Sequence, residues 1–238
     1  MKSIDVDYVL NSIPPILQYL PMTLSLALFS MIAGLVIGFF SALVQFYKIP
    51  VLKQFSSLYV SFIRGTPLLV QLFLVYYGFP LLYNALAEHF VVLQGFNINS
   101  IPPEFFAILA FSLNLGGYLS ETIRSAIESI DKGQFEAAES IGMSRMQTMY
   151  HVILPQATLI ALPNLGNTLI SMVKDTSLAF MIMVMEMMGQ AKIIGARGLR
   201  IFEVYLAVSL IYWATCFLLE KILYRLEKRL KASQGKIA

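Results

Sequence analysis

The stretch EAAESIGMSRMQTMYHVILP, residues 136–155, is a polar segment between two apolar runs that are each close to the length needed to cross a bilayer. Ala137 and Ala138 favour a helix, Glu136 suits the start of a helix, and Gly142 suits its end. A structured loop between membrane spans is typical of a segment on which another protein docks. The same residues also fit an ordinary structured connection.

The flanking residues predict two short helices. We expect Asp131–Gln134 to form a turn and residues 135–141 to form the first helix. Ser144 has a glutamine three residues later, the spacing of a capping box, and Pro155 is expected to interrupt or end the second helix. A DNA-binding helix-turn-helix is disfavoured, because Arg145 is the chief cation here and duplex binding needs several phosphate contacts.

The rest of the chain is dominated by apolar residues. Of its 238 residues, 58% are hydrophobic and only 13% are charged, which is too apolar for a soluble domain. We therefore expect an all-α polytopic membrane protein with about five transmembrane helices, forming a single domain over residues 1–238. The expected spans are residues 20–47, 58–86, 103–127, 158–188 and 204–219.

The distribution of lysine and arginine predicts an extracellular N-terminus and a cytoplasmic C-terminus. This orientation puts the polar loop, residues 131–157, and the basic tail, residues 221–238, in the cytoplasm. Lys2 and the cations of residues 192–200 oppose the bias. The inner segments carry Lys48, Lys53, Arg124, Lys132, Arg145, Lys221, Arg225, Lys228, Arg229, Lys231 and Lys236.

Three polar clusters lie inside the expected spans, where ionisable groups are costly and mark functional sites. The first contains a glycine and a proline that break a helix, the second shares one helical face, and the third interrupts the fourth span. Broken helices leave backbone groups free to bind small zwitterions. The clusters are Arg64-Gly65-Thr66-Pro67; Asn114, Tyr118 and Glu121; and Lys174-Asp175-Thr176-Ser177.

Each cluster also has a purely structural interpretation. Arg64 can extend to the inner headgroups, and Arg124 can pair with Glu121 at the end of the third span. Lys174 and Asp175 are adjacent and do not face each other on a helix, so each needs a separate partner.

The polar loop resembles the EAA loop of permeases of binding-protein-dependent ABC importers. The family spacing is EAA, three residues, glycine, nine residues and Ile-x-Leu-Pro, and here Val152 replaces the isoleucine. The resemblance implies a type I ABC importer permease whose coupling helix docks in a cleft of a cytoplasmic ABC ATPase subunit. The implied ATPase-coupling residues are Phe135, Glu136, Ala137, Ala138 and Gly142.

RGTPLL (residues 64–69) and KDTSLA (residues 174–179) resemble motifs of the polar amino acid branch, the histidine/glutamine-type permeases. Overall the chain is most similar to cystine-type permeases. The resemblance implies import of L-cystine or another polar or sulfur-containing amino acid across a bacterial plasma (inner) membrane. Implied partners are the ATPase subunits, which would bind ATP and Mg, an extracellular or periplasmic solute-binding protein, a second copy or homologous permease, and membrane lipid. No cofactor is implied for this subunit.

An amino acid substrate agrees with the residues themselves. Asp175 or Glu121 can accept hydrogen bonds from its ammonium group. Thr66, Ser177, Arg64 and freed backbone N–H groups can donate to its carboxylate.

Other protein classes fit less well. His89 and His151 fall on opposite sides of the membrane, and neither a nucleophile motif nor a Gly-x-x-x-x-Gly-Lys-Ser/Thr loop occurs, so an enzyme is not expected. The methionines of residues 181–188 suit packing better than metal binding, and membrane orientation explains the basic tail without nucleic acid. The alternative is a secondary amino acid transporter driven by an ion gradient, but such carriers often have two similar halves and no repeat is found.

Overall fold

The computed structural model describes residues 4–90, 95 and 97–234, which form helices and no strand. Within these residues α2, α4, α5 and α10 are each long and apolar enough to cross a bilayer, and the bent run from Arg145 to Gly198 is a fifth candidate. The predicted all-α architecture with about five spans is confirmed. The α-helices are α1 (Val6–Leu17), α2 (Leu20–Phe46), α3 (Leu52–Gly65), α4 (Leu68–His89), α5 (Pro103–Glu128), α6 (Lys132–Ser140), α7 (Arg145–Thr148), α8 (Leu154–Asp175), α9 (Met187–Gly198) and α10 (Ile201–Gln234).

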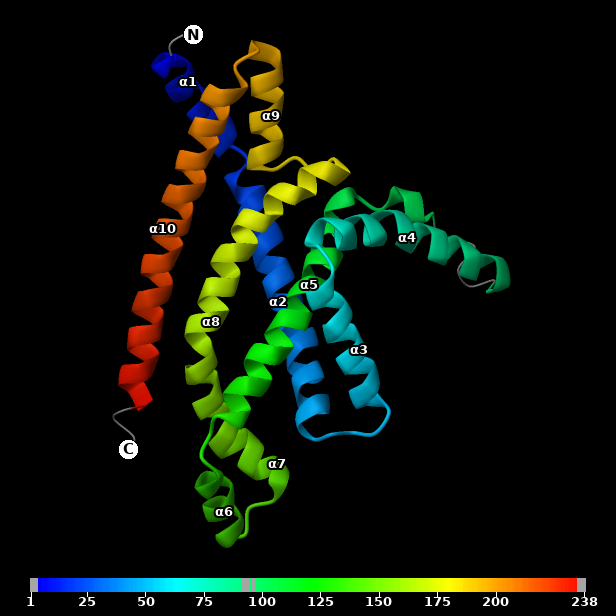
Figure 1. The fold of residues 1–238 in the computed structure, drawn as a ribbon, viewed down its shortest axis with the longest axis vertical. Coiled ribbons are helices and arrows are strands. Elements are labelled where there is room, and N and C mark those ends of the chain that lie inside the picture. Colours follow the sequence, from blue (N-terminus) through cyan, green and yellow to red (C-terminus); the bar gives the residue numbers. More distant parts are fainter. Residues whose placement is uncertain (1–3, 91–94, 96, 235–238) are drawn as a thin grey trace.

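The close packing of α2 on α5 forms the centre of the bundle (Figure 1). Gly34 and Gly38 permit this approach: a Cβ at Gly34 would lie 2.6 Å from the Cβ of Leu115, and one at Gly38 would lie 2.9 Å from the Cβ of Leu119. Apolar side chains contact lipid as readily as protein, so helices in a bilayer associate through close packing. Small residues permit that packing because they let the helix backbones approach each other. The α2–α5 pair is therefore the base on which the other helices are placed.

The predicted second span consists of two separate helices. α3 ends at Gly65 and α4 begins at Leu68, with Thr66 and Pro67 extended between them. A proline disfavours helical backbone at the residue before it, so the predicted break at this position is confirmed. The first helix begins at Leu52, six residues before the predicted start of the span.

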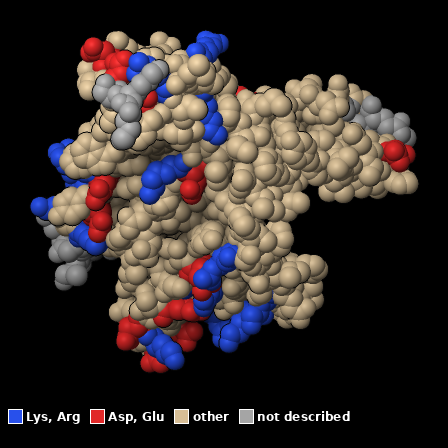
Figure 2. All heavy atoms as spheres, turned by 45° about the horizontal axis from the view of Figure 1, so that its top comes forward, with Lys and Arg blue, Asp and Glu red and all other residues tan. Residues whose placement is uncertain are grey.

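α4 projects sideways from the bundle (Figure 1). Only Gln71 and Leu72 are buried in it, and Leu81 is 71% exposed. The projecting arm is almost free of charged side chains (Figure 2). A helix that is apolar all round and makes so little contact with its own chain requires lipid or another protein around it.

The fourth region changes helix type where the sequence predicts an interruption. α8 ends at Asp175 and continues as a 3₁₀ helix over Thr176–Ile182. The complete break comes later, at Met183, which has a φ of 66°. The chain then bends by 56° into α9.

Pro155 interrupts the regular α-helix, as one of the two predicted outcomes, but does not end the helical run. The chain is helical from Arg145 to Ile182, and Pro155 lies in the first turn of α8, directly after a π-helical turn over Met149–Ile153. A proline ring clashes with the carbonyl four residues earlier, which here belongs to His151 inside that turn. The wider π-turn accommodates the ring and preserves one continuous helix.

The short helices of the polar loop follow most of the predicted signals. The capping box of Ser144 and Gln147 is present, and Gly142, with a φ of 83°, follows the end of α6. The predicted turn over Asp131–Gln134 is wrong. The Asp131 carboxylate accepts a hydrogen bond from the N–H of Gly133 at 2.7 Å, so α6 already begins at Lys132.

α1 and α9, which the sequence analysis did not assign as helices, lie at the end of the bundle opposite α6 and α7 (Figure 1). The Tyr8 hydroxyl donates to the carbonyl of Ile194 at 3.3 Å. Arg200 pairs with the carboxylates of Asp5 at 3.2 Å and Glu203 at 3.1 Å. Arg200 is one of the cations that oppose the predicted charge bias, and its charge is thus paired with two carboxylates.

The described N-terminal end and the end of α10 lie at opposite ends of the bundle, and α6 and α7 share the C-terminal end (Figure 1). α10 has 34 residues, so it is about 51 Å long and extends well beyond the predicted span of residues 204–219. Lys2 and Lys236, used in the charge argument, lie outside the described residues.

We predict that Gly38→Val destabilises the protein by roughly 1–3 kcal/mol, because the added atoms overlap α5. Gly78→Val is the matched control, since a Cβ at Gly78 meets no atom within 4 Å. Thermal unfolding in detergent should show a lower midpoint for Gly38→Val alone. Equal midpoints for the two variants would contradict a tight α2–α5 contact.

Candidate functional site

A polar cavity of about 610 Å³ lies between the α3–α4 break, α5 and α8. Asp175 is the only Asp, Glu, Lys or Arg among the described residues that line it. The other walls carry amide and hydroxyl groups together with a few apolar side chains. The polar lining residues are Thr66, Asn114, Tyr118, Thr122, Asn164, Asn167, Thr168, Ser171 and Asp175.

α8 contributes one whole wall of the cavity, which the sequence analysis missed. Asn164, Asn167, Ser171 and Asp175 follow one another at intervals of three or four residues, so they share a face of the helix. This polar stripe in an otherwise apolar helix was the available signal. Asn164, Asn167 and Ser171 have no ionisable neighbour within α8 before Lys174, so they did not stand out as a cluster in the sequence.

Four of the predicted substrate-binding residues meet in this cavity although they come from three different segments. Thr66 comes from the helix break, Asn114 and Tyr118 from α5, and Asp175 from the end of α8. The cavity therefore joins members of all three predicted clusters.

Arg64 and Gly65 line a different hollow of about 500 Å³, with Gln45 of α2 and Ser57 and Ser61 of α3. Arg64 lies twelve residues, or about 18 Å, along α3 from its start at Leu52.

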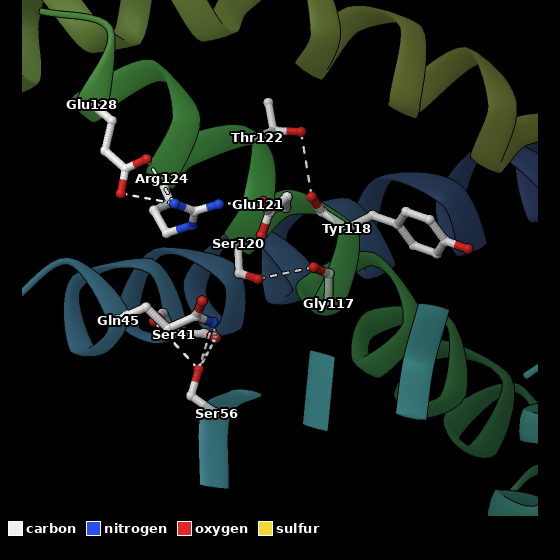
Figure 3. A network of polar contacts seen from close by, with 10 residues as sticks. All are labelled: Ser41, Gln45, Ser56, Gly117, Tyr118, Ser120, Glu121, Thr122, Arg124 and Glu128. Carbon is white, nitrogen blue, oxygen red and sulfur yellow. Dashed lines mark hydrogen bonds and ion pairs between the residues drawn. The ribbon is translucent and has the colours of Figure 1, made fainter. Parts of the chain in front are cut away.

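Glu121 pairs with Arg124 and does not line the cavity. Arg124 also contacts Glu128 at 2.6 Å, so it holds two carboxylates of its own helix. Figure 3 shows the ring of Tyr118 directed away from these three residues. The predicted pairing of Arg124 with Glu121 is confirmed.

Lys174, Thr176 and Ser177 are also absent from the cavity lining. Lys174 is exposed, whereas Thr176 is fully buried and donates its hydroxyl hydrogen to the carbonyl of Val173 at 2.8 Å. Ser177 is half-buried in the 3₁₀ segment.

Hydrogen-bond donors and acceptors are unequally available in the cavity. Thr66, Thr122 and Thr168 each donate the hydroxyl hydrogen to the carbonyl four residues earlier in the chain. This arrangement leaves the three hydroxyl oxygens as acceptors, and donation to a ligand requires a hydroxyl to rotate and give up its backbone bond. For Thr66, the predicted donation to a carboxylate would cost its bond to the carbonyl of Phe62 at 2.8 Å.

The buried carboxylate of Glu186 stabilises the second helix break, which lies between the 3₁₀ segment and α9. Glu186 is fully buried and accepts hydrogen bonds from the N–H of Gly189 at 2.7 Å and from the hydroxyl of Tyr212 at 2.8 Å. The Thr23 hydroxyl oxygen accepts from the N–H of Met187 at 3.2 Å. α2, α9 and α10 are thereby joined at this break. The sequence analysis did not identify Glu186, whose partners are distant in the sequence.

The segment predicted to couple to an ATPase has an anchored side and an exposed side. The Phe135 ring stacks on that of Phe46 at a centroid distance of 6.4 Å, and Ala138 is buried. Glu136, Ala137 and Gly142 are exposed.

Three large apolar side chains of this segment are also exposed: Ile141 at 79%, Met146 at 71% and Tyr150 at 71%. They lie at the end of the bundle that α6 and α7 form (Figure 1). We refer to these three side chains as the docking face. Residues 4–90, 95 and 97–234 contain no group of three or more His, Cys, Asp or Glu side chains placed to hold a metal ion.

Residues 34–232 match the family of binding-protein-dependent transport system inner membrane components. The chain is 40% identical over 236 residues to the L-cystine transport system permease protein TcyL of Bacillus subtilis (strain 168), covering 99% of this chain and 95% of that protein. It is 43% identical over 226 residues to the L-cystine transport system permease protein TcyB of the same organism, covering 94% of this chain and 90% of that protein.

The fold is also similar to a solved structure. The crystal structure of an amino acid ABC transporter with histidines has a TM-score of 0.80 and 34% identity to this chain, covering 96% of this chain and 100% of that chain. The resemblance inferred from the EAA loop is confirmed. The chain belongs to the family of binding-protein-dependent transport system inner membrane components, as an amino acid ABC importer permease with type I architecture.

Proposed function

We propose that the cavity between the α3–α4 break, α5 and α8 binds the transported amino acid, and that the docking face receives the energy of ATP hydrolysis from a separate subunit. One observation carries the proposal: a polar cavity with one ionisable side chain among its described lining residues lies beside a helical run that leads directly to the exposed docking segment. ATP and Mg belong to the partner ATPase, and this chain supplies the path and the coupling.

The cavity suits the ammonium group of an amino acid. Asp175 offers a charged acceptor, and the threonine oxygens offer neutral ones. Donors for the carboxylate come from the amide groups of Asn164 and Asn167 and from the Tyr118 hydroxyl. With no cation among its described lining residues, the cavity favours neutral zwitterions over acidic amino acids. L-cystine is a neutral zwitterion, and the relatives TcyL and TcyB support it as the substrate.

The proposed assembly contains two permease subunits, two ATPase subunits and an extracellular or periplasmic solute-binding protein. The N-terminus lies outside and the C-terminus lies in the cytoplasm, on the same side as the docking face. Closure of the ATPases displaces α6 and α7, and the helical run from Arg145 to Ile182 transmits this displacement to the Asp175 end of the cavity. The alternative is a secondary amino acid transporter driven by an ion gradient, which would need no ATPase.

Asp175→Asn should lower uptake roughly tenfold or more, because a charge-assisted hydrogen bond contributes about 1.5–3 kcal/mol. Glu220→Gln on α10 is the control, since Glu220 is exposed and does not line the cavity. Uptake of L-cystine is measured in proteoliposomes that contain the complete importer. Normal uptake by Asp175→Asn would remove Asp175 from the site, and uptake that follows a proton or sodium gradient without ATPase would favour the secondary transporter.

Met146→Asp should reduce co-purification of the ATPase more than about tenfold, because an apolar interface that buries an unpaired carboxylate is strongly destabilised. Met183→Asp is the control: Met183 is 77% exposed at the other end of the molecule, and aspartate tolerates its positive φ. Equal ATPase recovery from the two variants would place the ATPase contact elsewhere.

The cavity should be open to water. In a Cys216→Ser background, Asn167→Cys should react with a membrane-impermeant thiol reagent at least about tenfold faster than Ala161→Cys, because water supports the reactive thiolate. Ala161 lies on the same helix but lines an almost wholly apolar hollow of about 420 Å³. Equal labelling rates, measured by mass spectrometry, would contradict an aqueous path at Asn167.

A further inference from the structure

Gln71 is a buried amide at the base of α4, where the α3–α4 break meets α5. Its side chain is inside the protein, with only 3% of the residue exposed. The two hydrogens of its Nε2 are shared among three acceptors: the carbonyl of Ile63 at 2.9 Å, the carbonyl of Thr66 at 3.1 Å and the Thr66 hydroxyl oxygen at 2.9 Å. Its Oε1 accepts from Nδ2 of Asn114 at 2.9 Å. One side chain therefore joins the helix break to the wall of the cavity.

The surroundings of Gln71 fix the direction of its amide. A flipped amide would place Oε1 against the carbonyl oxygens of Ile63 and Thr66, which cannot donate. Donation from the Thr66 hydroxyl to a flipped Oε1 would also cost its bond to the carbonyl of Phe62. Nε2 must face the break, and Oε1 must face Asn114.

The direction of Gln71 in turn fixes Asn114. Because Oε1 only accepts, Asn114 has to turn Nδ2 toward Gln71, which leaves its Oδ1 on the other side. Among the described residues no buried side-chain oxygen or nitrogen lacks a hydrogen-bond partner. Oδ1 of Asn114 has no partner within that part of the chain, so it is accessible, and Asn114 lines the cavity. The α5 wall thus presents the Oδ1 carbonyl oxygen of Asn114 as an acceptor.

We propose that Gln71 is a positioning residue that holds Asn114 with its oxygen toward the cavity, as an acceptor for the ammonium group of the transported amino acid. This inference rests on the proposed function of the cavity. Gln71 itself does not line the cavity and acts through Asn114. In the same arrangement, the Gln71 amide also donates to the backbone carbonyls of Ile63 and Thr66, which the helix break leaves without helical partners.

The test is a double-mutant cycle between Gln71→Met and Asn114→Leu. Binding is measured on the permease–ATPase complex in nanodiscs without the binding protein. The probe is the amino acid taken up fastest from a panel of the twenty common L-amino acids and L-cystine. Gln71→Met should raise the Kd about tenfold when Asn114 is present, and less than about twofold in the Asn114→Leu background. Asn114→Leu alone should raise the Kd about tenfold or more.

Gln45→Met is the matched control. Gln45 also bridges two helices, donating to the Ser56 hydroxyl oxygen at 2.8 Å, but it does not line the cavity (Figure 3). Its Kd should stay unchanged. Where Gln71→Met does not yield a folded complex, Gln71→Asn serves instead, since the shorter amide cannot span from the break to Asn114.

Three outcomes overturn the inference. An equal rise in Kd in the two backgrounds would show that Gln71 acts only by holding the helix break. An unchanged Kd in Asn114→Leu would show that Asn114 does not contact the ligand, and no effect of Gln71→Met would remove Gln71 from the site. Each of these leaves the cavity itself to be judged by Asp175→Asn, so the failure of the inference and the failure of the proposed function are distinguishable.

Discussion

Backbone polar groups inside a membrane must find partners within the protein, and this constraint governs the whole structure. The chain breaks two of its membrane-length segments, and each break frees such groups. At the first break the Gln71 amide pairs the carbonyls of Ile63 and Thr66. At the second, the Glu186 carboxylate and the Thr23 hydroxyl accept from backbone N–H groups of α9. Irregular backbone is thus retained in an apolar bundle, and a polar cavity can form beside it.

Much of the fold was predictable because its signals are local in sequence. Length and hydrophobicity gave the spans, Pro67 gave the first break, and Ser144 with Gln147 gave the capping box. Pro155 interrupts the α-helix without ending the run, because a π-turn lets a proline remain within a helix, and no local pattern in the sequence indicates that turn. The sideways projection of α4 could not be predicted either, because it depends on how the helices pack in three dimensions and not on a local sequence pattern.

The candidate site was predictable only in part. Thr66, Asn114, Tyr118 and Asp175 stood out as polar residues in apolar surroundings, and the structure brings them together. Arg64 stood out by its charge but lies in another hollow, because its place on α3 turns it away from the cavity. The amides of α8 were overlooked because they stand in the part of α8 that has no helix-breaking pair or charged neighbour to mark a cluster. The hydrogen-bond direction of a buried amide depends on several distant partners, which a sequence does not show.

The π-turn before Pro155 has a mechanical consequence. It keeps the chain helical from Arg145 to Ile182, so α7 and the Asp175 end of the cavity belong to one continuous, curved helical run (Figure 1). The run packs against α5 within the bundle, so contacts along its middle constrain how either end can move. Its continuity links the position of the α7 end to that of the 3₁₀ end.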